Sequence, residues 1–175
     1  MTPALAARLA LPARGKAKVV AVTVDPDDAL LDRLMGDLAP DFIQLHGQES
    51  PSRVREVAAR SGAGVIKAIA VADADDLAAA AVFAPVADHL MFDAKAPPGS
   101  AIPGGTGVAI NAALLTDIHL ERPWFLAGGL DPWNVAQAVA QSRAPMVDVS
   151  SGVERGAGLK DPALIQSFLE AVRRA

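Results

Sequence analysis

The chain of 175 residues contains no cysteine, which excludes disulfides and thiolate metal ligands. Its three histidines, His46, His89 and His119, are far apart in the sequence and lack the short spacing of zinc ligands, so we expect no metal site. Only 4% of the residues are aromatic, the net charge is −4, and Lys and Arg form no cluster. Nucleic acid is therefore not an expected partner, because such binding needs a basic surface and stacking side chains.

Long apolar runs are also missing. No run reaches the roughly 18 residues that a membrane span requires. The first residues, Met1 to Leu5, lack the basic segment and apolar core of a secretory signal. We therefore expect a cytoplasmic protein that does not contact a membrane. The length and the 51% hydrophobic content suit one domain with a substantial core. No linker or low-complexity tract interrupts the chain, so residues 1–175 are predicted to form a single domain.

Six short runs, apolar on both sides of the pleat, alternate with helical patterns, as expected for parallel strands covered by helices. The predicted strands are Val19–Val24, Phe42–Leu45, Val65–Ile69, Leu90–Phe92, Trp124–Leu126 and Met146–Val149. Helix starts are indicated by a capping residue followed by proline. These pairs are Thr2-Pro3, Asp25-Pro26, Ser50-Pro51, Asp131-Pro132 and Asp161-Pro162, and Asp73 is a further candidate cap for a helix from Ala74 to about Phe83.

Two architectures fit six strands that alternate with helices: an open doubly wound sheet and a (β/α)8 barrel. A dinucleotide-binding Gly-x-Gly-x-x-Gly turn is absent, and the first predicted element is a helix without a strand of its own. A barrel needs eight strands at about 30 residues per unit. We therefore predict an α/β fold, a TIM (β/α)8 barrel that is incomplete at its N-terminal side, with about six parallel strands.

Two turns rich in glycine and serine follow the last two predicted strands, Ala127-Gly128-Gly129-Leu130 and Val149-Ser150-Ser151-Gly152. Glycines let the main chain approach a ligand closely, and a helix start adds positive partial charge. Either turn alone is equally compatible with an ordinary strand-to-helix connection. Together they resemble the phosphate cup after the last strands of many (β/α)8 barrels, so we predict a phosphorylated small molecule as the ligand.

Several motifs resemble one family in order and spacing. They are Gln44-Leu45-His46-Gly47, Ile66-Lys67-Ala68, Phe92-Asp93-Ala94-Lys95, Pro103-Gly104-Gly105-Thr106-Gly107, Ala127-Gly128-Gly129-Leu130 and Val147-Asp148-Val149-Ser150-Ser151-Gly152-Val153-Glu154. The family is phosphoribosylanthranilate isomerase, a (β/α)8 enzyme of tryptophan biosynthesis. The resemblance implies an Amadori rearrangement of N-(5-phosphoribosyl)anthranilate to 1-(2-carboxyphenylamino)-1-deoxyribulose 5-phosphate, with neither a metal nor an organic cofactor. We expect a phosphosugar substrate and a monomer or homodimer.

The resemblance gives Asp93 as the general acid that protonates the ring oxygen of the sugar. Its position after an apolar strand agrees with this, because barrel chemistry occurs at the carboxyl ends of the strands. A capping or ion-paired aspartate is the alternative. The resemblance places the phosphate on Gly128 and Gly129 and on Ser150 and Ser151.

Four further residues are expected at the substrate site. The resemblance suggests that Asp148 contacts sugar hydroxyls, although it could instead accept hydrogen bonds from loop N–H groups. Gln44 and His46 alternate along their strand and are predicted to point into the barrel mouth, where His46 could also be structural. Lys67 is expected to end its strand in the same way and to be a charge behind the residues that contact the substrate. Gly105 lies in a glycine-rich loop that resembles a rim over the substrate.

The chain departs from the family in one respect that bears on activity. The family's general base is a cysteine at the end of the first strand, and an arginine after the second strand holds the anthranilate carboxylate; neither segment is recognisable here. We therefore expect that this chain lacks the first strand, first helix and second strand and begins late relative to its gene, and that it could be inactive. The alternatives are a non-catalytic phosphosugar-binding partial barrel and another phosphosugar-barrel enzyme.

Overall fold

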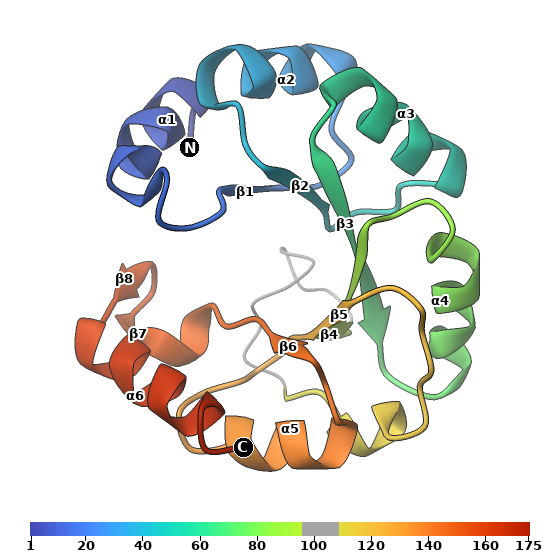
Figure 1. Cartoon of the computed structure of the whole chain (residues 1–175), viewed down its shortest axis with the longest axis vertical. Helices are drawn as coiled ribbons and strands as arrows, with labels where there is room; N and C mark the ends of the chain where they lie inside the picture. The colour runs from blue at the N-terminus through green and yellow to red at the C-terminus, as the bar shows by residue number, and fades with distance from the viewer. Residues whose placement is uncertain (96–108) are drawn as a thin grey trace.

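Six parallel strands form one curved sheet in chain order, and the helices surround it (Figure 1). The computed structural model describes residues 1–95 and 109–175. The strands are β1 (Val20–Thr23), β2 (Phe42–Leu45), β3 (Gly64–Val71), β4 (His89–Ala94), β5 (Trp124–Leu126) and β6 (Met146–Val147). All five neighbouring pairs are parallel. The predicted α/β fold with six parallel strands is confirmed.

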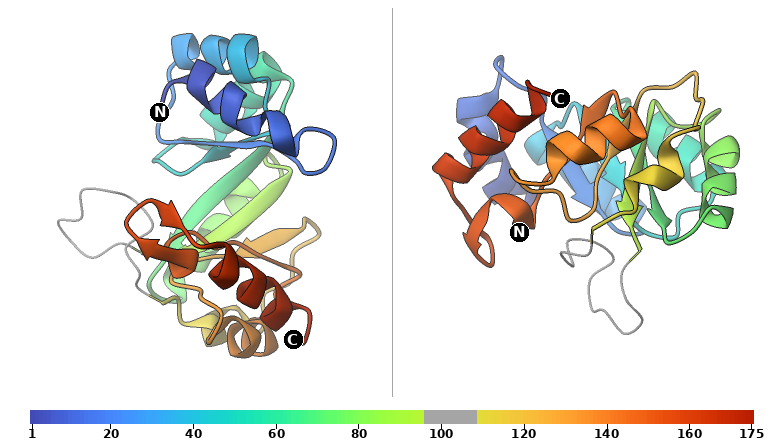
Figure 2. Two further views of the ribbon diagram at one scale, coloured as in Figure 1. Left: turned by 90° about the vertical axis from the view of Figure 1, so that its left-hand side faces the viewer. Right: turned by 90° about the horizontal axis from the view of Figure 1, so that it is seen from below.

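The sheet does not close within the described residues, since β1 pairs only with β2 and β6 only with β5. The first helix, α1, and the last, α6, lie at the two ends of the arc of helices, and both face the viewer in the left panel of Figure 2. A hairpin that the sequence patterns did not predict, β7 (Glu154–Gly156) with β8 (Leu159–Lys160), follows β6.

Helices occupy most of the predicted segments. The α-helices are α1 (Pro3–Ala10), α2 (Asp28–Arg33), α3 (Pro51–Ser61), α4 (Ala78–Phe83), α5 (Val135–Ser142) and α6 (Pro162–Val172). Shorter helical turns are η1 (Leu11–Ala13), η2 (Leu34–Leu38), η3 (Asp75–Leu77), η4 (Ala112–Leu115) and η5 (Ser151–Val153). The predicted caps Thr2, Ser50 and Asp161 each accept a hydrogen bond from a main-chain N–H of the helix that follows.

Two predicted caps are wrong. Asp25 does not cap α2, because its backbone is left-handed (φ 44°) and its carboxylate instead accepts the Gln48 N–H. Asp27 provides that cap, accepting from Leu30 N at 2.7 Å. Asp131 accepts from Trp133 N and Asn134 N, but it closes a turn, and α5 begins only at Val135.

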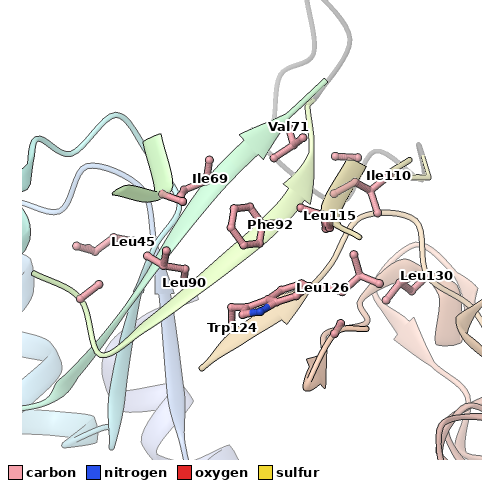
Figure 3. Packing of buried hydrophobic residues seen from close by; sticks show 14 of the residues in the cluster. Leu45, Ile69, Val71, Leu90, Phe92, Ile110, Leu115, Trp124, Leu126 and Leu130 are labelled. Carbon is pink, nitrogen blue, oxygen red and sulfur yellow. The ribbon is translucent and has the colours of Figure 1, made fainter. Parts of the chain in front are cut away.

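The larger hydrophobic core lies between the sheet and its helices. Phe92 of β4 and Trp124 of β5 meet edge to face in this layer, with ring centroids 5.4 Å apart (Figure 3). A smaller cluster on the opposite face of the strands contains Ile66, Ala68 and Met91. Residues on this inner face alternate with those of the outer core, so the strands are apolar on both sides, as their sequences predict.

The inner face of β1 and of Val24, which directly follows it, is the exception, because the valines there are exposed. Val20, Val22 and Val24 are 40%, 63% and 50% exposed, whereas the intervening Ala21 and Thr23 are buried. On the other edge of β1, no described strand supplies a partner. An apolar strand with an unpaired edge favours self-association.

We expect Val22→Lys to reduce self-association of this chain. Burying a valine side chain contributes about 1.5–3 kcal/mol, so removing one from a contact should raise the concentration needed for association by about tenfold or more. Sedimentation velocity over a concentration series measures this. Val82→Lys changes a similarly exposed valine on α4 and should leave association as it is. Equal effects of the two substitutions would show that β1 is not the contact.

Among the described residues, no helix has the length and apolar character needed to cross a membrane.

Candidate active site

Asp93 and His46 meet on the inner face at the carboxyl ends of β4 and β2. Asp93 Oδ2 lies 3.0 Å from His46 Nε2, and the two side chains are 9% and 17% exposed. The residues lie 47 positions apart in the sequence, and the parallel sheet brings them together through β3. Since Asp93 belongs to β4 itself, its carboxyl group is held on a rigid element, where a catalytic group is best oriented.

Asp93 also lies against the first glycine-rich turn. Gly128 has φ +88°, and a Cβ at this position would lie 2.9 Å from Asp93 Oδ1 and 2.4 Å from Ala94 N. Only glycine combines this left-handed backbone with so close an approach. Asp93 and the Gly128-Gly129 turn are therefore on the same part of the rim.

The two predicted phosphate turns contact each other directly. A Cβ on Gly152 would lie 1.9 Å from Leu130 O and 3.0 Å from Asp131 Cα, so the turn after β6 packs backbone to backbone on the turn after β5. Within residues 1–95 and 109–175, the amides of Gly129, Leu130, Ser151 and Gly152 donate to no protein acceptor. Adjacent amides without protein acceptors form the kind of concave surface that binds anions.

Lys160, which belongs to the motifs that carry the family resemblance but was given no role at the site, adds a cation beside the second turn. Its Nζ donates to Ser150 O at 2.8 Å and pairs with Glu154 Oε1 at 2.7 Å. The pairing lowers the pKa of Glu154, mainly through the hydrogen bond from Lys160. The hairpin of β7 and β8 brings Lys160 back next to the turn after β6. The sequence around Lys160 does not predict this hairpin, so it does not place the lysine near Ser150.

Asp148, which follows β6, lies near the same cluster. Partial burial of its carboxyl group raises the pKa of Asp148, and the negative charge of Asp93 adds to this as a smaller effect. His46 and Lys160 act in the opposite direction. The residue as a whole is exposed, so water screens these effects. The two carboxylates therefore repel each other weakly.

We expect Asp148→Asn to stabilise the chain slightly at neutral pH. A raised pKa in the folded state means that this group favours folding below its ordinary value of about 3.9 and loses that contribution as the pH rises through the folded value. The gain of the variant should be below about 1 kcal/mol because the site is exposed. Thermal unfolding at pH 3.5 and pH 7.5 tests this.

The gain should appear at pH 7.5 and be absent at pH 3.5, where Asp148 is largely protonated in both states. Asp37→Asn, at an exposed position of η2, is the matched control and should show no such difference. A gain that is the same at both pH values would contradict the electrostatic origin.

Two other predicted site residues have different surroundings. Gln44 is on the inner face but only 5% exposed, and its Nε2 lies 3.3 Å from Met91 Sδ, deeper than His46. Gly105 lies outside the described residues. The structure thus brings together Asp93, His46, Asp148 and both phosphate turns. The roles of these residues stay predictions.

Metal ligands do not gather in the described part of the chain: no three His, Asp or Glu side chains lie close enough to hold an ion.

Comparison with known proteins identifies the family. The family model described as N-(5′-phosphoribosyl)anthranilate (PRA) isomerase matches residues 4–171. The chain belongs to this family. The N-(5′-phosphoribosyl)anthranilate isomerase of Caulobacter vibrioides is 61% identical over 176 residues, which cover all of this chain and 80% of the relative. That of Rhodopseudomonas palustris strain BisA53 is 51% identical over 96% of this chain and 77% of the relative.

Solved structures of the family have the same fold. The phosphoribosylanthranilate isomerase of Thermotoga maritima superposes with a TM-score of 0.86 at 28% identity, over all of this chain and 82% of that one. A structure of the isomerase in complex with reduced 1-(o-carboxyphenylamino)-1-deoxyribulose 5-phosphate superposes with a TM-score of 0.82 at 26% identity, over all of this chain and 81% of that one.

Proposed function

We propose that this chain binds N-(5-phosphoribosyl)anthranilate and acts as a phosphoribosylanthranilate isomerase in tryptophan biosynthesis, in the cytoplasm and as a monomer or homodimer. One observation carries the proposal: Asp93, in contact with His46, lies on the same rim as the two contacting turns, whose amides at Gly129, Leu130, Ser151 and Gly152 donate to no acceptor among residues 1–95 and 109–175. A substrate whose phosphate occupies these turns would present its sugar to Asp93.

In the proposed reaction, Asp93 donates a proton to the ribose ring oxygen. The bond between that oxygen and C1′ breaks, and the lone pair of the anthranilate nitrogen forms the Schiff base. His46 orients the Asp93 carboxyl through the 3.0 Å contact. Such acid catalysis contributes typically 10²–10⁴-fold. The phosphate is held by main-chain amides of the two turns, those of Gly129 and Ser151 among them, with Lys160 nearby, so the sugar is fixed before its ring opens.

Completion of the rearrangement requires a base that removes the C2′ proton. The resemblance assigns a cysteine to this step, and the 175 residues contain none. This observation favours a second candidate function, a phosphosugar-binding partial barrel without turnover. Both candidates share the phosphate turns and differ only in the proton transfer at C2′.

Two measurements, one of turnover and one of binding, distinguish the two candidate functions. Purified chain is mixed with freshly prepared phosphoribosylanthranilate, and the loss of substrate fluorescence is followed. Turnover above the uncatalysed rate supports the isomerase. Calorimetric binding of reduced 1-(o-carboxyphenylamino)-1-deoxyribulose 5-phosphate without turnover supports the binding protein. Absence of both would refute the phosphosugar site itself.

A further inference from the structure

Lys67 and Glu49 form an ion pair that lies behind the site, on the helix-covered face of the sheet. Lys67 Nζ is 2.8 Å from Glu49 Oε2, and the two side chains are 4% and 1% exposed. Lys67 does not end its strand as predicted, because β3 continues to Val71. Its side chain lies under the Phe83 ring of α4, with Nζ 5.5 Å from the ring centroid, so it does not line the mouth of the barrel.

The pair is costly to bury, so its retention needs a reason in this fold. Burial alone would raise the pKa of Glu49, but hydrogen bonds from Lys67 and from two main-chain amides outweigh it and lower the pKa. The Glu49 carboxylate is therefore charged at neutral pH, and the hydrogen bonds that it accepts are charge-assisted and strong.

These hydrogen bonds converge on the two residues that flank His46. Lys67 Nζ donates to Leu45 O at 3.3 Å and to Gly47 O at 2.8 Å. The Gly47 N–H lies 3.1 Å from each oxygen of Glu49. The main chain on both sides of His46 is thus fixed by one buried pair, and His46 N itself donates to Thr23 O at 2.9 Å.

A third contact connects the pair to the neighbouring loop. Glu49 Oε1 accepts from Asp25 N at 2.9 Å, and the Asp25 carboxylate accepts from Gln48 N at 2.8 Å. A Cβ on Gly47 would lie 2.5 Å from Asp25 Oδ1, so the loops after β1 and β2 are in close contact here. The segment that carries His46 is therefore fixed by three sets of contacts: with β1, with the loop after β1, and with the buried ion pair.

We infer that Lys67 and Glu49 are positioning residues that set the His46 imidazole against the Asp93 carboxyl without touching the substrate. This inference rests on the proposed function for its kinetic consequence, but the geometry that it describes is independent of turnover. A displacement of about 1 Å in a catalytic contact lowers rates by as much as 10²-fold. Loss of the pair should therefore act mainly on kcat.

The test uses the double variant Glu49→Gln/Lys67→Met, because a single substitution would leave an unpaired buried charge and could unfold the chain. The first measurement is the ¹³Cε1–¹Hε1 NMR signal of His46, which is one of only three histidines in the sequence. Asp93→Asn defines where this signal moves when the contact with the carboxylate is changed. In the folded double variant we expect the signal to move most of the way toward that position.

The control is Asp32→Asn/Arg60→Gln, which removes an exposed pair joined at 2.9 and 2.7 Å between α2 and α3. It should leave the His46 signal in place. An unmoved signal in the folded double variant, or an equal movement in the control, would overturn the inference.

The second measurement is the steady-state rate with phosphoribosylanthranilate. We expect kcat to fall about 10- to 100-fold in the double variant while KM changes by less than about twofold, as for an interaction that matters in the transition state. A rise in KM at constant kcat would overturn the inference. Absence of turnover in the unmodified chain would refute the isomerase but would leave the NMR result as the decisive test of positioning.

Discussion

Asp93→Asn should abolish most of the turnover of this chain. The amide has the size of the carboxyl group and can still contact His46, but it cannot donate an acidic proton to the ring oxygen. We expect kcat with phosphoribosylanthranilate to fall by about 10²–10⁴-fold, the usual contribution of a general acid. KM should change little, since in the proposed site the two glycine- and serine-rich turns supply the binding. Fluorescence-monitored kinetics measures both.

Asp88→Asn is the matched control for this substitution. Asp88 immediately precedes β4, at the opposite end of the strand from the proposed site, and its carboxylate accepts from Val65 N at 2.8 Å. Its loss should lower stability but leave the activity of the folded chain close to normal. Asp93→Asn with undiminished kcat would show that Asp93 is an ion-paired structural residue, the alternative that the sequence left open.

Gly152→Ala is expected to separate the two phosphate turns. Its added Cβ would lie 1.9 Å from Leu130 O, and because the neighbouring atoms belong to the main chain, no side chain can simply rotate away. The turn after β6 must then move. We expect the affinity for inorganic phosphate to fall at least about tenfold, equivalent to about 1.4 kcal/mol. Overpacking of this kind should also cost about 1–3 kcal/mol of stability.

Calorimetric titration with inorganic phosphate and thermal unfolding measure these two effects separately. Gly36→Ala is the control, since a Cβ at that position meets nothing within 4 Å and its backbone is not left-handed. It should bind phosphate as the unmodified chain does. Unchanged phosphate affinity in Gly152→Ala would show that the contact between the two turns does not form the anion site.

The sequence was most informative where local chemistry decides structure. Strand β2 and strand β5 have the predicted bounds, because short apolar runs between turn residues have few other arrangements. Caps followed by proline placed α1, α3 and α6 correctly. The prediction was wrong at Asp25 and Asp131, where the side chain accepts from a neighbouring loop or turn and the helix begins later.

The sequence predicted the position of some site residues in the sheet correctly and of others incorrectly. Gln44 and His46 share the inner face, as strand alternation predicts, but their different depths follow from contacts with Met91 and Asp93 on another strand. Lys67 was assigned to the wrong face. A lysine in an apolar strand gives no sign of which face it occupies until its partner, Glu49, is located on the adjacent loop.

By itself, the sequence determined the fold class, because periodicity, capping and turn chemistry are local properties. Its short motifs carried the family resemblance, and the resemblance gave the residue types of the site. Only the tertiary structure decided that Asp93 meets His46, that Gly152 packs on Leu130, and that a buried ion pair holds the main chain around His46. These contacts join residues 18 to 47 positions apart. They depend on the register and curvature of the sheet, which no short stretch of sequence encodes.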